Sequence, residues 1–294
     1  MKNASDTEID LKVKQITASL QPPHSVFYDV ERCRKDYCEA TDNPKMWAKL
    51  KPAIDKTVKG LMEKIHIALE ALENSEFYKE FMEQMQDPEI LEQIQRVRGT
   101  DPHHSHLQMV FYGIGNIDPE IRTRYSHSRS QMQLAFAILM KEKFDFVNDI
   151  VLYDPILSTI ERTAINELGC TVLHDNEFGK RTVDRPTIFF MPNCPFYLHD
   201  NVLGANWTPA NLNKIIVLSY TFQDFPNDKS LGFTKVDAVR SSDRLLHEVR
   251  LPQTDIRPAV YQELFKDFSW HFFAWDGSLE DLNKLEEPYL CYKK

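Results

Sequence analysis

Two glycines follow an apolar run at a spacing that suits close approach of the backbone to a ligand. They are Gly113 and Gly115 in "QMVFYGIGNIDPEIRTRYSHSRSQMQLAFAIL", which spans Gln108 to Leu139. Asp154 ends the next apolar run, "DIVLYDP", where a carboxylate can accept hydrogen bonds from the hydroxyls of a ribose. This pattern predicts a site for an adenosine-containing cofactor.

The same stretch departs from the known glycine motifs in two ways. Asp118 stands where G-x-G-x-x-G has its third glycine, and Ile117 stands where G-x-G-x-G has it. The loop from Ile117 to Arg129 is also too long for a phosphate turn that leads straight into a helix, and Asp118 and Glu120 repel a pyrophosphate. In the alternative interpretation, the glycines form a tight turn beneath a packed helix and Asp154 caps the next element. The departures favour this alternative.

A group of polar residues opens the helix that follows. "SHSRSQ" places hydroxyls, a histidine and Arg129 at a predicted helix N-terminus, where backbone N–H groups and the helix dipole attract an anion. We predict that Arg129 contacts such an anion. Plain capping of the helix by Ser128 or Ser130 is the alternative, and it is the more common role of serine at this position.

The dipeptide Cys194-Pro195 follows a later apolar run, "PTIFFMP". A cysteine followed by proline can supply a thiolate to haem iron, because the proline turns the chain away from the ligand. Haem is therefore one candidate ligand. In the alternative, which the frequency of such dipeptides favours, Cys194 is a small residue in a turn.

Neither a metal site nor a catalytic group is predicted. His103, His104 and His106 form "HHSH" in a presumed surface linker without nearby cysteines, and Cys33 and Cys38 have no second Cys/His pair at zinc-finger spacing. The chain also lacks G-x-S-x-G, H-E-x-x-H and the P-loop motif. The sequence thus indicates no established catalytic activity.

From residue 107 onward, strand-like and helix-like segments alternate. Strands are predicted over 107–114, 149–155, 170–174, 186–192 and 214–222, and helices over 130–143, 158–169 and from 195 or 197 to 205. Ser158 and Glu161 form a capping box at the start of the second helix, and Gly169 ends it. Because each parallel pair needs a helix-length crossover, the alternation predicts an α/β fold with a Rossmann-like, mostly parallel, doubly wound sheet preceded by N-terminal helices.

Such a sheet brings the carboxyl ends of its parallel strands to one edge, where ligands bind at the point of reversed strand order. The glycines, Asp154 and Cys194 all follow predicted strands, as do several other polar residues. We therefore predict one cofactor-binding set, made of Gly113, Gly115, Asn116, Arg129, Asp154, Asn193 and Cys194.

The rest of the chain divides into three predicted parts. Residues 1–43 are polar and irregular, which predicts a flexible arm. Residues 44–100 carry one apolar stripe from Trp47 to Leu69 and a second from Phe77 to Ile94, which predicts two helices packed on the core. Residues 107–294 form the α/β domain, with further helices over 236–251 and a last buried strand within 259–275.

The net charge and the cysteine content bear on the partners and the location of the chain. The net charge of -9 argues against a dedicated surface for nucleic acid or for an anionic membrane. The first residues lack the apolar stretch of a signal peptide, and five scattered cysteines are an odd number, so we expect reduced thiols and a cytoplasmic location, with the nucleus as a second one.

Several segments, in order, resemble the Sensitivity-to-Red-Light-Reduced-like (SRR-like) family. They are "FYGIGNI", "SRSQMQLAFAIL", "VLYDPILSTIERTAINELGCTVLHDNEFGKRTVDRPTIFFMPNCPFYLHDNVLGANW", "NKIIVLSYTF" and the late "FSWHFF". The positions that match the family motifs are Gly113, Gly115, Asn116, Ser128, Arg129, Gln131, Asp154, Pro155, Glu177, Gly179, Pro192, Cys194 and Pro195. The resemblance implies a regulator of circadian clock input in plants and, in animal relatives, of clock-gene expression and haem biosynthesis; it implies no catalytic residue.

Two functions follow from these observations. The first is a regulatory protein whose Rossmann-like domain binds a protein partner or a small ligand, haem included. The second is a transferase or oxidoreductase that holds an adenosine-containing cofactor through Gly113, Gly115 and Asp154. The missing third glycine favours the first.

Overall fold

The computed structural model describes residues 6–20, 40–99, 106–117, 126–222, 242–254 and 264–284. The helices there are α1 (Asp6–Leu20), α3 (Pro44–Glu73), α4 (Glu76–Gln84), α5 (Pro88–Arg98), α6 (Ser126–Lys143), α7 (Thr159–Glu167), α8 (Phe196–Ala205), α9 (Pro209–Leu212) and α11 (Leu279–Lys284), with a 3-10 helix, η4 (Ser242–Arg244). The strands are β1 (Leu107–Tyr112), β2 (Val147–Tyr153), β3 (Thr171–Val172), β4 (Thr187–Phe190), β5 (Ile215–Tyr220), β6 (Leu246–Arg250) and β7 (Phe268–Phe273).

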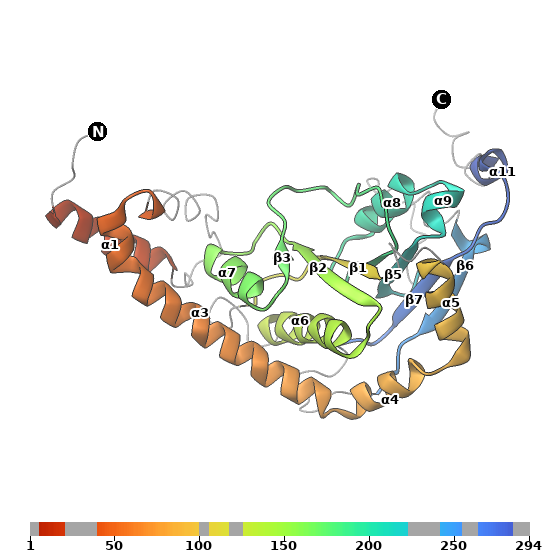
Figure 1. The fold of residues 1–294 in the computed structure, drawn as a ribbon, viewed down its shortest axis with the longest axis horizontal. Coiled ribbons are helices and arrows are strands. Elements are labelled where there is room, and N and C mark those ends of the chain that lie inside the picture. Colours follow the sequence, from red (N-terminus) through yellow and green to blue (C-terminus); the bar gives the residue numbers. More distant parts are fainter. Residues whose placement is uncertain are drawn as a thin grey trace, which may run out of the picture.

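The strands form one sheet in the order β3-β2-β1-β4-β5-β7-β6 (Figure 1). Strands β1 to β5 pair in parallel, whereas β7 is antiparallel to both β5 and β6. The fold is therefore mixed α/β with a mostly parallel sheet, as the alternating segments predict. The chain steps outward from β1 to β2 and β3 and then returns to the other side of β1, so the strand order reverses between β1 and β4.

Helices cover both faces of the sheet because successive side chains of each strand point to opposite sides. Met109 and Phe111 of β1 share one core cluster with Phe136 of α6, whereas Val110 and Tyr112 share another with α8. All six residues of β1 are buried, as expected for a central strand covered on both faces.

The long helix α3 packs on α6 and α7 (Figure 1). It begins where the side chain of Asn43 accepts a hydrogen bond from the backbone N–H of Met46 (3.2 Å) and Pro44 occupies the first turn. Its buried positions recur every three or four residues and are Met46, Leu50, Ile54, Val58, Leu61, Ile65, Ala68 and Leu72. The apolar stripe predicted from the sequence is thus confirmed, with Trp47 and Leu69 only partly buried.

The N-terminal segment differs from its prediction. Residues 6–20 form α1, where the sequence predicted an irregular arm, because Ile9 and Ile16 are buried in the main core cluster and Val13 packs against it. These apolar residues are few among many polar ones, so their helical spacing is easy to overlook. The boundaries of the three-part division remain a prediction.

Two further elements also differ. The second N-terminal helix is in fact two, α4 and α5, because Pro88 cannot continue a helix and Asp87 caps the new one by accepting from the N–H of Glu89 (2.8 Å). The predicted helices over 236–251 are wrong where the structure describes them, since 242–250 form η4 and β6. Residues 236–241 lie outside the described part. In contrast, the predicted buried strand is confirmed as β7.

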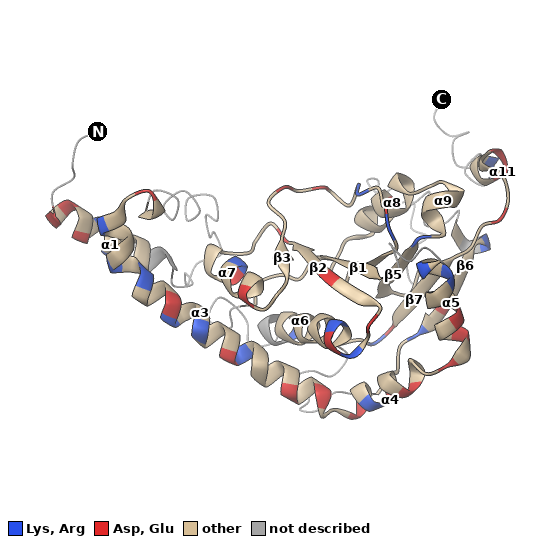
Figure 2. Ribbon diagram, viewed as in Figure 1, with Lys and Arg blue, Asp and Glu red and all other residues tan. Residues whose placement is uncertain are grey.

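Acidic and basic residues are interspersed along α3 (Figure 2). Lys51 pairs with Asp55 (2.6 Å), and Lys45 pairs with Asp6 of α1 (3.4 Å). Exposed pairs of this kind contribute little stability each. Within the described residues, none of the helices is long and apolar enough to cross a membrane.

Candidate functional site

Asp154 lies at the carboxyl end of β2 and joins two turns. Its side chain is 6% exposed; Oδ2 accepts from the backbone N–H of Gly115 (2.8 Å) and Oδ1 from that of Ile156 (3.0 Å). Burial raises the pKa of this carboxyl, and the two hydrogen bonds oppose the rise. Asp154 therefore fastens the loop after β1 to the turn after β2, and Ser158, not Asp154, caps α7.

The two glycines permit close packing within the chain itself. Both have φ of +74°, in the region that favours glycine. A Cβ on Gly113 would lie 2.8 Å from the Sγ of Cys194, and one on Gly115 would lie 3.3 Å from the Oγ of Ser130. The space beside each glycine is thus occupied by a protein side chain, which supports the tight-turn interpretation.

Asn193 connects the ends of β1 and β4, at the reversal of strand order. Its Nδ2 donates to the carbonyl oxygen of Gly113 (2.9 Å) and to Oε1 of Gln133 in α6 (2.8 Å). Gln133 is buried, although it opens the otherwise apolar helix segment "QLAFAILM". A buried glutamine in an apolar run is a signal that could have identified it, because buried polar groups need partners.

Cys194 follows β4 and packs against Gly113. Its side chain is 9% exposed, and burial, with the nearby Asp154 carboxylate, raises the pKa of the thiol far above its ordinary value. Haem iron would need open space in front of the sulfur. Cys194 is buried against Gly113, so the residues present do not fit haem.

Asn116 belongs to a second buried network, centred on Glu161. Its Nδ2 donates to the carbonyl oxygen of Ile156 (3.1 Å) and to Oε2 of Glu161 (3.3 Å). Glu161 also accepts from the N–H of Ile117 (2.6 Å) and forms the predicted capping box with Ser158, which is confirmed. One carboxylate thus starts α7 and holds the loop after β1; sequence reasoning found only the first role.

Arg129 lies elsewhere along this edge. It is close enough to Tyr220 at the end of β5 to lower the pKa of that phenol, which burial raises. The side chains of residues 126–128 lie outside the described part, so anion binding at the start of α6 remains a prediction. The structure accordingly brings together Gly113, Gly115, Asp154, Asn193 and Cys194. Asn116 follows Gly115, but its side chain bonds to Ile156 and Glu161 instead of this group, and Arg129 lies near Tyr220.

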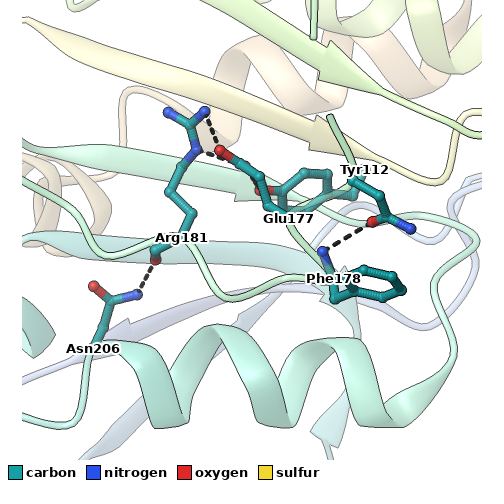
Figure 3. Close-up of polar contacts among 6 residues, drawn as sticks. Tyr112, Glu177, Phe178, Arg181 and Asn206 are labelled. Atoms are coloured by element: carbon teal, nitrogen blue, oxygen red, sulfur yellow. Dashed lines mark hydrogen bonds and ion pairs between the residues drawn. The ribbon is translucent and has the colours of Figure 1, made fainter. Parts of the chain in front are cut away.

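A third polar cluster fixes the loop between β3 and β4 (Figure 3). The Glu177 carboxylate accepts from the Tyr112 hydroxyl and from Nε (2.9 Å) and Nη2 (2.7 Å) of Arg181. Burial alone would raise the pKa of Glu177, but these hydrogen bonds lower it overall. Asn206 at the end of α8 donates to the carbonyl oxygen of Arg181 (2.8 Å) and accepts from the N–H of Val183 (2.9 Å).

Metal-ligating groups do not gather in the described residues: no three His, Cys, Asp or Glu side chains there could hold an ion. His103, His104, Cys33 and Cys38 lie outside those residues.

Comparison with known proteins identifies relatives with this domain. The SRR1 domain matches residues 82–272. The Arabidopsis thaliana protein SENSITIVITY TO RED LIGHT REDUCED 1 is 38% identical over 218 residues, which cover 73% of this chain and 74% of that protein. An SRR1-like protein of Mus musculus is 36% identical over 121 residues, 40% of this chain and 46% of the relative.

A solved structure also shows a limited likeness. The crystal structure of the 23S rRNA methyltransferase ErmE is 12% identical, with a TM-score of 0.34 over 70% of this chain and 78% of that one. The sequence of the Arabidopsis relative is far more similar, at 38% identity. The segment that the SRR1 domain matches includes every residue of the predicted cofactor-binding set. The chain therefore belongs to the SRR1 domain family.

Proposed function

We propose that this chain is a regulatory protein of light response and circadian clock input, and that it acts by binding a protein partner. The proposal rests on its relative, whose name records a reduced sensitivity to red light. Control of haem biosynthesis, which the family resemblance implies, belongs to the same proposal. We place the protein in the cytoplasm or nucleus, where its free thiols stay reduced.

One observation carries the choice of partner binding over cofactor chemistry. At the reversal of strand order, the polar groups are bonded to one another: Asp154 to Gly115 and Ile156, and Asn193 to Gly113 and Gln133. A cofactor site would instead direct such groups into open space. In our proposal the sheet is Rossmann-like and doubly wound, and hydrogen bonds within the chain use the groups that would bind a ligand in other such sheets.

The alternative function is a transferase or oxidoreductase with an adenosine-containing cofactor. A carboxylate has about four lone-pair positions, and two backbone N–H groups use only two of those of Asp154. Because Asp154 is buried, a ribose could reach the remaining positions only if the turns around Gly113 opened. This requirement makes the alternative testable by ligand-induced stabilisation.

A complementation experiment tests the regulatory function. Arabidopsis plants that lack their own relative would be given this chain, and their response to red light and the period of their rhythm would be measured. We expect partial or full restoration of both. Plants that stay unrestored while they accumulate the folded chain would contradict the proposal.

A thermal-shift screen separates the two functions. The purified chain would be heated with S-adenosylmethionine, nicotinamide dinucleotides, nucleotides or haem. A ligand at about 100 times its dissociation constant adds roughly 2.7 kcal/mol of stability. We expect no saturable shift; a saturable shift that Asp154→Ala abolishes would establish the cofactor alternative.

A further inference from the structure

Phe178, in the loop between β3 and β4, holds a backbone conformation that bulky side chains rarely adopt. Its φ is +51°, and its side chain is 57% exposed. A left-handed conformation strains any residue that has a Cβ, and it is least suited to a large one. Strained residues with exposed side chains are found at functional sites more often than elsewhere.

Contacts on both sides of Phe178 hold this conformation in place. The N–H of Phe178 donates to Oδ1 of Asn176 (2.9 Å; Figure 3). Its carbonyl oxygen accepts from Nδ2 of Asn201 in α8 (2.8 Å). Gly179 packs so closely on α8 that a Cβ there would lie 2.7 Å from the carbonyl oxygen of Leu198. The ring is therefore presented by a rigid backbone.

Further side-chain contacts connect the same loop to the sheet and to α8. Glu177 binds both Tyr112 of β1 and Arg181, and Asn206 binds the backbone of Arg181. These contacts fix the backbone of the loop within the chain itself. A backbone fixed in this way loses little further entropy when a partner binds.

Tyr197 supplies a second exposed aromatic side chain beside this loop. It is 44% exposed and lies one turn before Asn201 on α8, so the two share the helix face that receives the backbone of Phe178. Aromatic residues of this kind dominate the binding energy of many protein interfaces.

The charges of the loop indicate the chemistry of its partner. Asp175, Glu177 and Asp184 are balanced in number by Lys180, Arg181 and Arg185, although the whole chain carries -9. The loop therefore carries no net charge that would select a strongly charged partner. The exposed rings determine the match instead, and they are best buried in an apolar pocket without charged groups.

We propose that Phe178 and Tyr197 form an aromatic anchor that inserts into an uncharged, apolar pocket of a protein partner. This inference rests on the proposed function, and it names the surface through which that function acts. It assigns the loop between β3 and β4, instead of the glycine turns, as the recognition element of the domain.

A selection experiment tests the anchor directly. A random peptide library displayed on phage would be selected on the immobilised full chain, and the affinities of the enriched peptides would be measured. We expect apolar, uncharged peptides whose affinity falls about tenfold or more with Phe178→Asn and also falls with Tyr197→Ala. Asparagine tolerates a positive φ, so Phe178→Asn removes the ring without adding strain.

The matched control is Ile67→Ala, which removes another exposed apolar side chain, on the outer surface of α3. Its affinities should equal those of the unsubstituted chain, and the thermal unfolding of all variants should confirm that they are folded. Enriched peptides that bind Phe178→Asn with unchanged affinity, or a selection that enriches none, would overturn the proposal.

Complementation separates a failure of the anchor from a failure of the proposed function. If the chain restores the red-light response of the Arabidopsis line and Phe178→Asn restores it equally, the anchor is wrong and the regulatory function stands. If the unsubstituted chain does not restore it, the regulatory function fails, and the peptide affinities still decide whether the anchor exists.

Discussion

Gly113 meets two separate demands, one on its backbone angle and one on the space beside it. Gly113→Ala must place a methyl group 2.8 Å from the Sγ of Cys194 while the backbone keeps a φ of +74°. Overpacking costs about 1–3 kcal/mol and left-handed strain about 1–2 kcal/mol, so we expect a loss of about 3 kcal/mol in the free energy of unfolding. Urea denaturation measures it.

Gly60→Ala is the control for this substitution. Gly60 lies in α3, and a Cβ there meets nothing within 4 Å, so alanine should stabilise the helix by up to about 1 kcal/mol. Adding Cys194→Ala to Gly113→Ala should recover only the steric part of the loss. Equal stability of the Gly113→Ala and Gly60→Ala chains would show that the turn after β1 adapts freely.

Phe178 offers a second test at this scale, because its backbone conformation disfavours a large side chain whereas the proposed recognition of a partner needs the ring. Phe178→Asn should keep or slightly raise the melting temperature, since asparagine accepts its φ of +51° better than phenylalanine does. Differential scanning calorimetry measures the change. A clear drop in melting temperature would mean that the ring is structural.

Single residues were predictable from the sequence only where local chain geometry requires them. The positive φ of Gly113 and Gly115 follows from a glycine pair after a strand, and the capping box follows from Ser158 and Glu161. Gln133 accepts a hydrogen bond from Asn193, which lies 60 residues further along the chain, so no local sequence pattern predicts this contact.

Helix α7 depends on a carboxylate that also serves its neighbour. Glu161→Gln keeps the size of the side chain but turns one acceptor oxygen into a donor, which then faces the N–H of Ile117 or of Ser158. A buried donor that faces a donor costs about 2–3 kcal/mol, and we expect a loss of that size in the free energy of unfolding. Glu167→Gln, on the exposed end of α7, should change it little. If urea denaturation shows as small a loss for Glu161→Gln as for Glu167→Gln, the contacts of Glu161 with the N–H groups of Ile117 and Ser158 contribute little.

Elements could be predicted where their apolar pattern is strong in the sequence itself. The almost fully buried strands β1, β4, β5 and β7 are of this kind. β6 is not, because its half-buried "LHEVR" contains good helix formers and becomes a strand only by pairing with β7. Helix α1 was missed for a related reason, since its stability comes from contacts with α3.

At the scale of the whole molecule, two buried histidines make the packing of the sheet sensitive to acid. Burial lowers the pKa of His199 to about 3 and that of His271 to about 4; Glu248, 3.8 Å from Nε2 of His271, opposes the second shift. The ring of Phe222 lies next to both imidazoles. Protonation of either would place a charge inside the core cluster that α8 shares with the sheet.

Both histidines therefore stay neutral in the folded chain at pH values where they are protonated in the unfolded chain, in which their pKa is about 6.5. The contribution of these histidines to the free energy of unfolding is fully present above that pH. It falls as the pH decreases toward the folded pKa values, by up to about 1.4 kcal/mol per pH unit for each histidine. Urea denaturation between about pH 7.5 and about pH 5.5 avoids most titration of carboxylates. His271→Gln should reduce the slope in this range, whereas His66→Gln, exposed on α3, should leave it unchanged. An unchanged slope in His271→Gln would mean that the folded chain can admit a proton at His271 without loss, and hence that this part of the core opens to water.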